Sequence, residues 1–172
     1  MSDALFINSS LITLDLSENN LTGRILDWIS TLPALSVFLL KADQLNGEFP
    51  IHLCRLQSLS ILDLSQNKLS SHIPSCLSNL TLKPRREKSY DRSTSYFVLS
   101  LSDEVIVDMG LRIYNLIGSS EKVEFLTKGA RYTYKGNVLE LLSAIDLSCN
   151  QLKGIIPPGL GNLSEIRGLN IT

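Results

Sequence analysis

The sequence lacks an excess of charge of either sign, because its 172 residues carry 16 basic and 17 acidic side chains. This balance argues against nucleic acid or an anionic membrane surface as the main partner. Aromatic residues make up only 6% of the chain, so aliphatic side chains must build the core. No run of about 18 apolar residues occurs, so no transmembrane helix is predicted. The first residues also lack the basic and apolar stretches of a secretory signal.

Residues suited to catalysis are equally scarce. The chain has two histidines, His52 and His72, and neither is placed by the sequence beside an acid and a nucleophile. No glycine-rich phosphate loop, kinase motif or cluster of metal ligands is present. We therefore predict that the protein is not an enzyme and that it needs no cofactor.

A 24-residue repeat dominates the sequence. Its first leucines are Leu11, Leu35 and Leu59, and the pattern returns at Leu142 and Ile166, again 24 residues apart. The shared pattern is Leu-x-x-Leu-x-Leu-x-x-Asn-x-Leu-x-Gly-x-Ile-Pro. Its alternating leucines predict a short strand that buries every second side chain, and stacked turns share one aliphatic core. We expect an α/β-type leucine-rich-repeat solenoid with short parallel strands on its concave face.

The asparagine of the repeat predicts a ladder inside the solenoid. At Asn19, Asn67 and Asn150 a side-chain amide can donate to backbone carbonyl groups that would otherwise be buried without a partner. The second repeat has Asp43 at this position and Phe38 in place of a leucine. Because a carboxylate cannot donate, we expect a locally irregular turn there.

An insert interrupts the repeats. Leu59 and Leu142 are 83 residues apart, and subtracting one repeat of 24 leaves 59 extra residues at Lys83–Leu141. We expect repeats over 1–82 and 142–172 and an insert over 83–141, with a polar loop at its start, Lys83–Ser95. Short apolar runs in the insert fit strands, although runs of this length also fit helices. They are Tyr96–Leu101, Val105–Met109, Leu111–Ile117, Val123–Thr127 and Arg131–Tyr134.

The concave face is the expected binding surface, because solenoids bind partners along extended concave surfaces. Its candidate residues on the repeat strands and just after them are Asp15, Ser17, Lys41, Asp63 and Ser65. Asp15, Asp63 and Asp146 align as a column, but Leu39 interrupts it. We predict no metal site in this column.

The glycine and the isoleucine-proline pair of the repeat make it similar to the plant extracellular leucine-rich repeat. An insert within such repeats resembles the island of plant receptor kinases and receptor-like proteins. The stretch Val123–Gly136, with five residues between Lys128 and Tyr134 and with Lys135-Gly136 after them, is similar to the island exit of receptor-like proteins. The resemblance implies a membrane-anchored receptor ectodomain that binds a peptide or protein ligand. It also implies adaptor and SERK-type co-receptor kinases as partners, at the extracellular face of the plasma membrane.

Under this resemblance the ligand or co-receptor would contact the insert through Lys128, Arg131, Tyr132, Tyr134 and Lys135. Tyrosine and arginine are enriched at the energetic centres of interfaces. The alternative is that the tyrosines pack the insert against the solenoid. Two other functions stay open: a secreted protein resembling polygalacturonase inhibitors, which are uninterrupted solenoids, and a truncated copy without function. We interpret the chain itself as a fragment of a longer protein.

Two further features concern the secretory route. Five Asn-x-Ser/Thr acceptors lie outside the insert and predict N-glycosylation of the parent protein: Asn8, Asn20, Asn79, Asn162 and Asn170. Cys54 and Cys76 fall on the outer side of neighbouring turns. Turns about 5 Å apart allow a disulfide between them, and the alternative is a pair of buried thiols. Cys149 is expected to be free.

Overall fold

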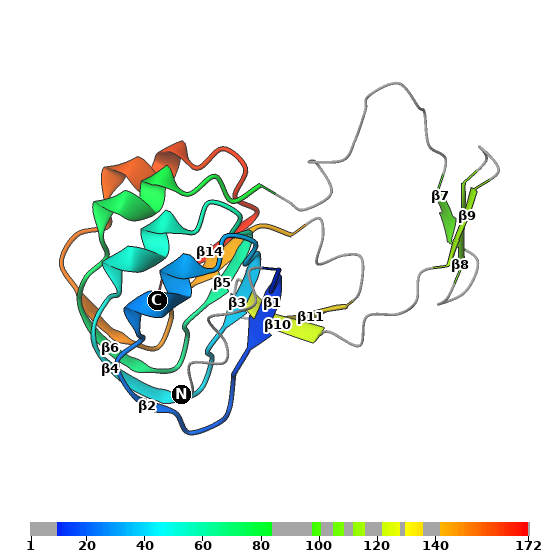
Figure 1. The fold of residues 1–172 in the computed structure, drawn as a ribbon. Helices are drawn as coiled ribbons and strands as arrows, with labels where there is room; N and C mark the ends of the chain where they lie inside the picture. Colours follow the sequence, from blue (N-terminus) through cyan, green and yellow to red (C-terminus); the bar gives the residue numbers. More distant parts are fainter. Residues whose placement is uncertain are drawn as a thin grey trace. The chain divides into compact units, whose positions relative to one another are not determined.

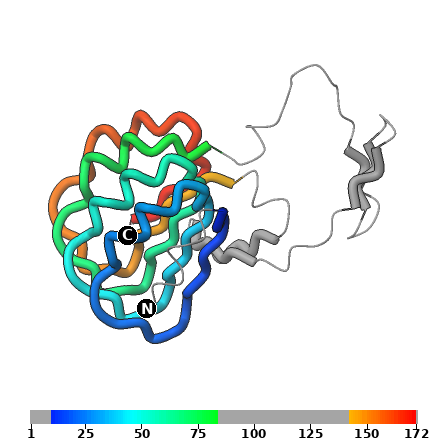
Figure 2. Tube along the Cα trace, in the orientation of Figure 1, coloured from blue at the N-terminus to red at the C-terminus, as the bar shows by residue number. Residues whose placement is uncertain are grey.

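The structure, a computed structural model, describes residues 10–83 and 142–171 in full and the backbone of five strands between them. The chain divides into two compact units, Met1–Pro84 with Leu142–Thr172, and Arg85–Leu141. The first unit contains the repeats, which form the successive coils seen in Figure 2. The expected loop at 83–95 lies, after Lys83, outside the described residues.

One face of the repeat unit is a parallel sheet with one strand from each repeat. Its order is β1 (Thr13–Asp15), β3 (Val37–Leu39), β5 (Ile61–Asp63), β12 (Ala144–Asp146) and β14 (Gly168–Asn170). The pairing of β5 with β12 joins the third repeat to the fourth across the insert. This confirms the predicted solenoid and its short parallel strands.

The repeat unit has a second parallel sheet, which the repeat pattern did not predict. Its strands follow the ladder position of each turn. Its order is β13 (Gln151–Lys153), β6 (Lys68–His72), β4 (Gln44–Glu48) and β2 (Thr22–Gly23). Apart from one leucine in each of β13, β6 and β4, these segments consist of polar residues and glycine, so they lack the alternation that marks a half-buried strand. Backbone pairing between stacked turns makes them strands.

The side opposite the first sheet carries short 3₁₀ helices rather than α-helices (Figure 1). They are η2 (Asp27–Thr31), η3 (Ile51–Arg55), η4 (Ser75–Asn79) and η7 (Pro158–Asn162). Three of them begin directly after a proline of the repeat: Pro50, Pro74 and Pro157. Proline fixes its own backbone φ and cannot donate a hydrogen bond, so it suits the position before a helical turn.

The core is one aliphatic cluster shared by all the turns. Leu35, Leu53, Leu62 and Leu77 are completely buried, and Phe38 fills its leucine position with no exposed surface. Each turn thus buries its apolar side chains against its neighbours, as expected of a solenoid.

The predicted asparagine ladder forms at Asn67 and Asn150, whereas Asn19 is exposed and its Nδ2 donates to the Leu16 and Ser17 carbonyl oxygens of its own turn. Asn67 Nδ2 donates to the carbonyl oxygens of Leu40 and Leu64, at 2.7 and 3.2 Å, and Asn67 Oδ1 accepts from Leu45 N at 3.0 Å. Asn150 repeats this arrangement, accepting from Leu69 N at 3.0 Å.

The expectation of an irregular turn at Asp43 is wrong. The residue before each ladder position has a left-handed backbone with φ near +55°, and Ala42 before Asp43 conforms at +57°. Asp43 Oδ1 accepts from the backbone N–H groups of Asn19 and Leu21, at 3.0 and 2.9 Å. The carboxylate therefore supplies the acceptor half of the ladder, which is enough to keep the turn regular.

The described residues of the insert unit form antiparallel strands, in agreement with the strand interpretation of its apolar runs. β7 (Val98–Ser100), β8 (Val105–Asp108) and β9 (Arg112–Asn115) form one sheet. β10 (Lys122–Thr127) and β11 (Ala130–Lys135) form a hairpin.

Candidate binding surface

The expected concave-face residues differ in accessibility. Asp15 is exposed, and Ser17 and Lys41 are half-buried. Asp63 and Ser65, expected on an open surface, are only 2% and 3% exposed. Strand alternation predicts that these side chains share one face, but it does not determine how much of that face is accessible. The accessible part of the expected surface therefore lies toward the first two repeats.

Asp63 is held in a hydrogen-bonded turn with Ser65. Its Oδ1 accepts from the Ser65 backbone N–H at 2.9 Å and from the Ser65 hydroxyl at 2.6 Å. Burial raises the pKa of Asp63 to about 6, and the nearby Asp146 adds to the rise. The hydrogen bonds from Ser65 and the positive charge of Lys41 act in the opposite direction.

The fourth and fifth repeats extend the same network. Asp146 Oδ1 accepts from the N–H and hydroxyl of Ser148, at 2.9 and 2.6 Å. Asp146 Oδ2 accepts from Asn170 Nδ2 at 3.2 Å. Sequence reasoning did not assign Ser148 and Asn170 to this surface, although their alignment with Ser65 and Asp63 in the repeat was a signal that could have done so.

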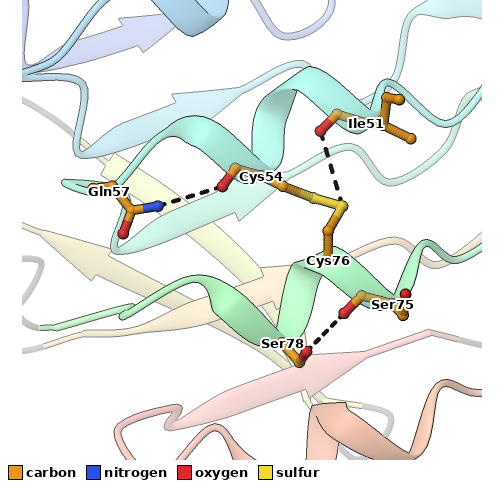
Figure 3. Close-up of a disulfide and its surroundings, with 6 residues drawn as sticks. All are labelled: Ile51, Cys54, Gln57, Ser75, Cys76 and Ser78. Carbon is orange, nitrogen blue, oxygen red and sulfur yellow. Dashed lines mark hydrogen bonds between the residues drawn. A yellow bond between two sulfur atoms is a disulfide. The ribbon is translucent and has the colours of Figure 1, made fainter.

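A disulfide joins the outer side of two neighbouring turns (Figure 3). Cys54 of η3 and Cys76 of η4 are bonded, with their Cα atoms 5.8 Å apart. Cys76 Sγ also lies 3.9 Å from the carbonyl oxygen of Ile51. Closing a loop with a sequence separation of 22 residues lowers the entropy of the unfolded chain, an effect worth about 3 kcal/mol. Cys149 is free and exposed.

His52 connects the first two 3₁₀ helices. Its Nδ1 lies 2.8 Å from Asp27 Oδ1, and its Nε2 is buried without a hydrogen-bond partner among the described residues. Burial lowers the pKa of His52 and the charge of Arg55 lowers it further, whereas Asp27 and the Leu26 backbone raise it. The pair is a contact between the first and second turns.

The glycosylation acceptors fall into three groups. Asn20, Asn79 and Asn162 are exposed, and the last two end η4 and η7 on neighbouring turns. Asn170 is half-buried, and its amide donates to Asp146. Asn8 lies outside the described residues.

The insert residues expected to bind a partner cluster on the β10–β11 hairpin. Tyr132 and Tyr134 are opposite Phe125 and Val123 in its register, and Arg131 and Lys135 lie in the same strand. Lys128 lies outside the described residues. Within the part of the chain that is described, no group of three His, Cys, Asp or Glu residues could hold a metal ion. No helix in that part is long and apolar enough to span a bilayer.

The sequence and fold match known proteins of one kind. The Leucine Rich Repeat family profile matches residues 10–32, 58–80 and 141–163. The second repeat, with Asp43, is outside these matches, although its turn is regular in the structure.

Two relatives are plant receptor-like proteins. Receptor-like protein EIX2 of Solanum lycopersicum is 38% identical over 178 residues, covering 94% of this chain and 17% of that protein. Receptor-like protein 13 of Arabidopsis thaliana is 37% identical over 142 residues, covering 79% of this chain and 13% of that protein. The chain thus spans less than a fifth of the length of either relative.

Among solved structures, the fold is similar to the Arabidopsis receptor kinase HAESA, described in complex with the peptide hormone IDA and the co-receptor SERK1. The TM-score is 0.56 at 22% identity, covering 94% of this chain and 18% of that one. The repeat, its two parallel sheets and the sequence relatives agree: the chain belongs to the plant leucine-rich-repeat receptor-like proteins.

Proposed function

We propose that the chain is part of the ectodomain of a plant cell-surface receptor-like protein, at the extracellular face of the plasma membrane. In this role it binds an extracellular peptide or protein ligand together with a co-receptor kinase of the SERK type and an adaptor kinase, in defence or developmental signalling. The function is binding and not catalysis. The structural relative HAESA, named with a peptide hormone and a co-receptor, supports these classes of partner.

The observation that carries the proposal is the separate antiparallel unit between the third and fourth repeats. A solenoid needs no such unit to fold, because β5 pairs directly with β12 across the insertion. Inhibitors of cell-wall-degrading enzymes with the same repeat are uninterrupted solenoids. The insert therefore favours the receptor over a secreted polygalacturonase-inhibitor-like protein, which is the alternative. A truncated copy without function is the other alternative.

Within the insert, we assign the partner contacts to Lys128, Arg131, Tyr132, Tyr134 and Lys135. Four of the five lie in β11, which pairs along its whole length with β10. A hairpin presents its residues from a backbone held on one side by ladder hydrogen bonds, which reduces the entropy lost on binding. On the repeats, the accessible residues Asp15, Ser17 and Lys41 would form the concave part of the surface.

The test is recruitment of the co-receptor by the receptor that contains this stretch. Tyr134→Ala is expected to lower co-immunoprecipitation with the co-receptor kinase at unchanged surface abundance, because truncating a tyrosine at an interface centre costs about 2 kcal/mol or more. Thr133→Ala, the adjacent residue of β11, is the control and is expected to change neither. If Tyr134→Ala lowers abundance and association in equal proportion, the residue is structural and the assignment fails.

The proposed receptor function also predicts glycans on the exposed acceptors. Asn20, Asn79 and Asn162 are expected to be modified during secretion. Asn170 is expected to stay unmodified, because the residue is half-buried and its amide nitrogen donates to Asp146. Glycopeptide mass spectrometry of the secreted ectodomain distinguishes these acceptors, and a glycan at Asn170 alone would contradict the assignment.

A further inference from the structure

Asp63 and Asp146 are direct neighbours in the concave sheet. They are register partners of the parallel strands β5 and β12, which lie about 4.8 Å apart. Both residues are 2% exposed. Two buried carboxyl groups at this spacing resist being ionised together, because each charge loses hydration and repels the other.

The two side chains are held in the same orientation. Each Oδ1 accepts a backbone N–H and a hydroxyl from a serine two residues further along the chain, Ser65 or Ser148, at 2.6 to 2.9 Å. These bonds prevent the carboxyl groups from rotating away from each other without losing four hydrogen bonds. The repulsion is therefore built into the turn geometry and is not relieved by side-chain motion.

The charged groups around the pair are few among the described residues. Lys41, which follows β3, attracts the Asp63 carboxylate. Asp15 in β1 is exposed and is separated from Asp63 by Leu39 in the sheet order. β14 contributes Asn170, a neutral donor to Asp146 Oδ2. Among the described residues, Lys41 is thus the cation that acts on Asp63.

The pair sits where the solenoid has no short covalent connection. Neighbouring strands elsewhere in this sheet are 24 residues apart in sequence, whereas the partners Asp63 and Asp146 are 83 apart. We call this junction of β5 and β12 the seam. Its backbone bonds include Leu64 N to Asp146 O, Gln66 N to Ser148 O and Ala144 N to Ser60 O, each 2.9 Å long.

We propose that Asp63, held beside Asp146, acts as a proton-operated clasp of the seam: when the Asp63 carboxyl group holds a proton, the third and fourth repeats are joined more tightly than when it is ionised. Mild acidification then tightens the base of the insert instead of loosening it. The clasp depends on the repeat unit alone, so its test is independent of any receptor assay.

The sign of the effect follows from the Asp63 carboxyl group. Its pKa in the folded chain, about 6, lies above the value of about 3.9 for an unfolded aspartate. The folded chain therefore binds the proton first as the pH falls. The stabilisation is complete below about pH 4 and is lost as the pH rises through about 6.

Hydrogen exchange of the full chain tests the clasp directly. After correction for intrinsic exchange rates, the protection factors of the Leu64, Gln66 and Ala144 amides are expected to rise roughly tenfold from pH 7 to pH 5. In Asp63→Asn the rise is expected to disappear, with protection at pH 7 at least equal to that of the wild type. Asn170 in the fifth repeat shows that an asparagine fits this column.

Two further variants make the outcome decisive. Asp146→Asn removes the negative charge that repels the Asp63 carboxylate, so it is expected to reduce the rise in protection. This variant replaces Asp63→Asn in the test if Asp63→Asn does not fold. Asp15→Asn, in the same column but exposed, is expected to leave the rise intact. The clasp is refuted if wild-type protection is flat or falls toward pH 5, or if Asp15→Asn removes the rise as fully as Asp63→Asn.

Discussion

The carboxylate of Asp43 accepts the backbone N–H of Leu21 at 2.9 Å, in the way that the amide of Asn67 accepts that of Leu45 at 3.0 Å. The two residues differ at their second polar atom. Asn67 Nδ2 donates to carbonyl oxygens, whereas Asp43 Oδ2 is buried with no hydrogen-bond partner among the described residues. At the ladder position of the second repeat, the acceptor contact is therefore present and the donor contact is missing.

This difference predicts that Asp43→Asn stabilises the protein. The new amide would donate to the carbonyl groups that the ladder satisfies elsewhere, and we expect a gain of about 1 to 2 kcal/mol in the free energy of unfolding. Chemical denaturation measures it. The reverse change, Asn67→Asp, is the matched control and is expected to destabilise by about 1 to 3 kcal/mol. Destabilisation by both changes would mean that Oδ2 has a partner in solution.

A second prediction concerns Ser71, which has a left-handed backbone at φ +76°. The same position is glycine in the other turns, Gly23, Gly47 and Gly154, at φ +88° to +91°. Ser71→Gly is expected to stabilise by about 1 kcal/mol, because a side chain is strained in this conformation. Thermal unfolding checks the shift.

The reverse substitution at the same column is the control. A Cβ on Gly154 would lie 2.2 Å from the His72 ring atom Cδ2. Gly154→Ala should therefore lower the melting temperature through both strain and a clash. If Ser71→Gly lowered it as well, the serine would have a stabilising contact that outweighs its backbone strain.

A third prediction follows from the lowered pKa of His52. The unfolded chain binds this proton first, so stability is constant above about pH 6.5 and falls as the pH drops through the lower folded-state value. This slope is opposite in sign to that of Asp63. His52→Gln is therefore expected to make the protein less sensitive to acid between pH 7 and pH 5 in denaturation experiments. An unchanged slope would show that His52 is protonated equally in both states.

The fourth prediction is that the insert can be removed. Deleting 83–141 joins Leu82 to Leu142 and restores the 24-residue period. The seam pairing of β5 with β12 already exists, so cooperative thermal unfolding should be kept. Deleting one residue more, 83–142, shifts the fourth repeat by one position and exchanges the faces of its strand. The shorter chain is expected to lose cooperativity, and equal behaviour of the two would refute the repeat register.

The leucine period determined most of the fold because each leucine has one role, which is to fill the shared core. It could not reveal the second sheet, since Gln44–Glu48 has no alternation and is a strand only because a neighbouring turn is stacked on it. Asp43 was misjudged because the ladder needs an acceptor as well as a donor. The repeat period predicted that Cys54 and Cys76 lie on adjacent turns. It could not decide whether they are free thiols or form a disulfide.

The surface was harder to predict than the core. Alternation placed Asp63 and Ser65 on the concave face, but the side chains there are buried and bonded to each other. Asp15 occupies the same column and is exposed. Identical sequence positions thus differ in accessibility because accessibility depends on which turns and segments surround each residue. The repeat pattern is the same for all turns and contains no information on this point.

The Cys54–Cys76 bond also determines how far mechanical load can travel. The chain leaves the repeats for the insert only seven residues after Cys76, at Lys83. A partner that pulls on the insert would peel the third turn from the solenoid beginning at that exit. Because Cys76 is covalently bonded to Cys54 of the preceding turn, the load then passes through this bond to Cys54, and residues 55–75 bear no unravelling force until the bond is reduced.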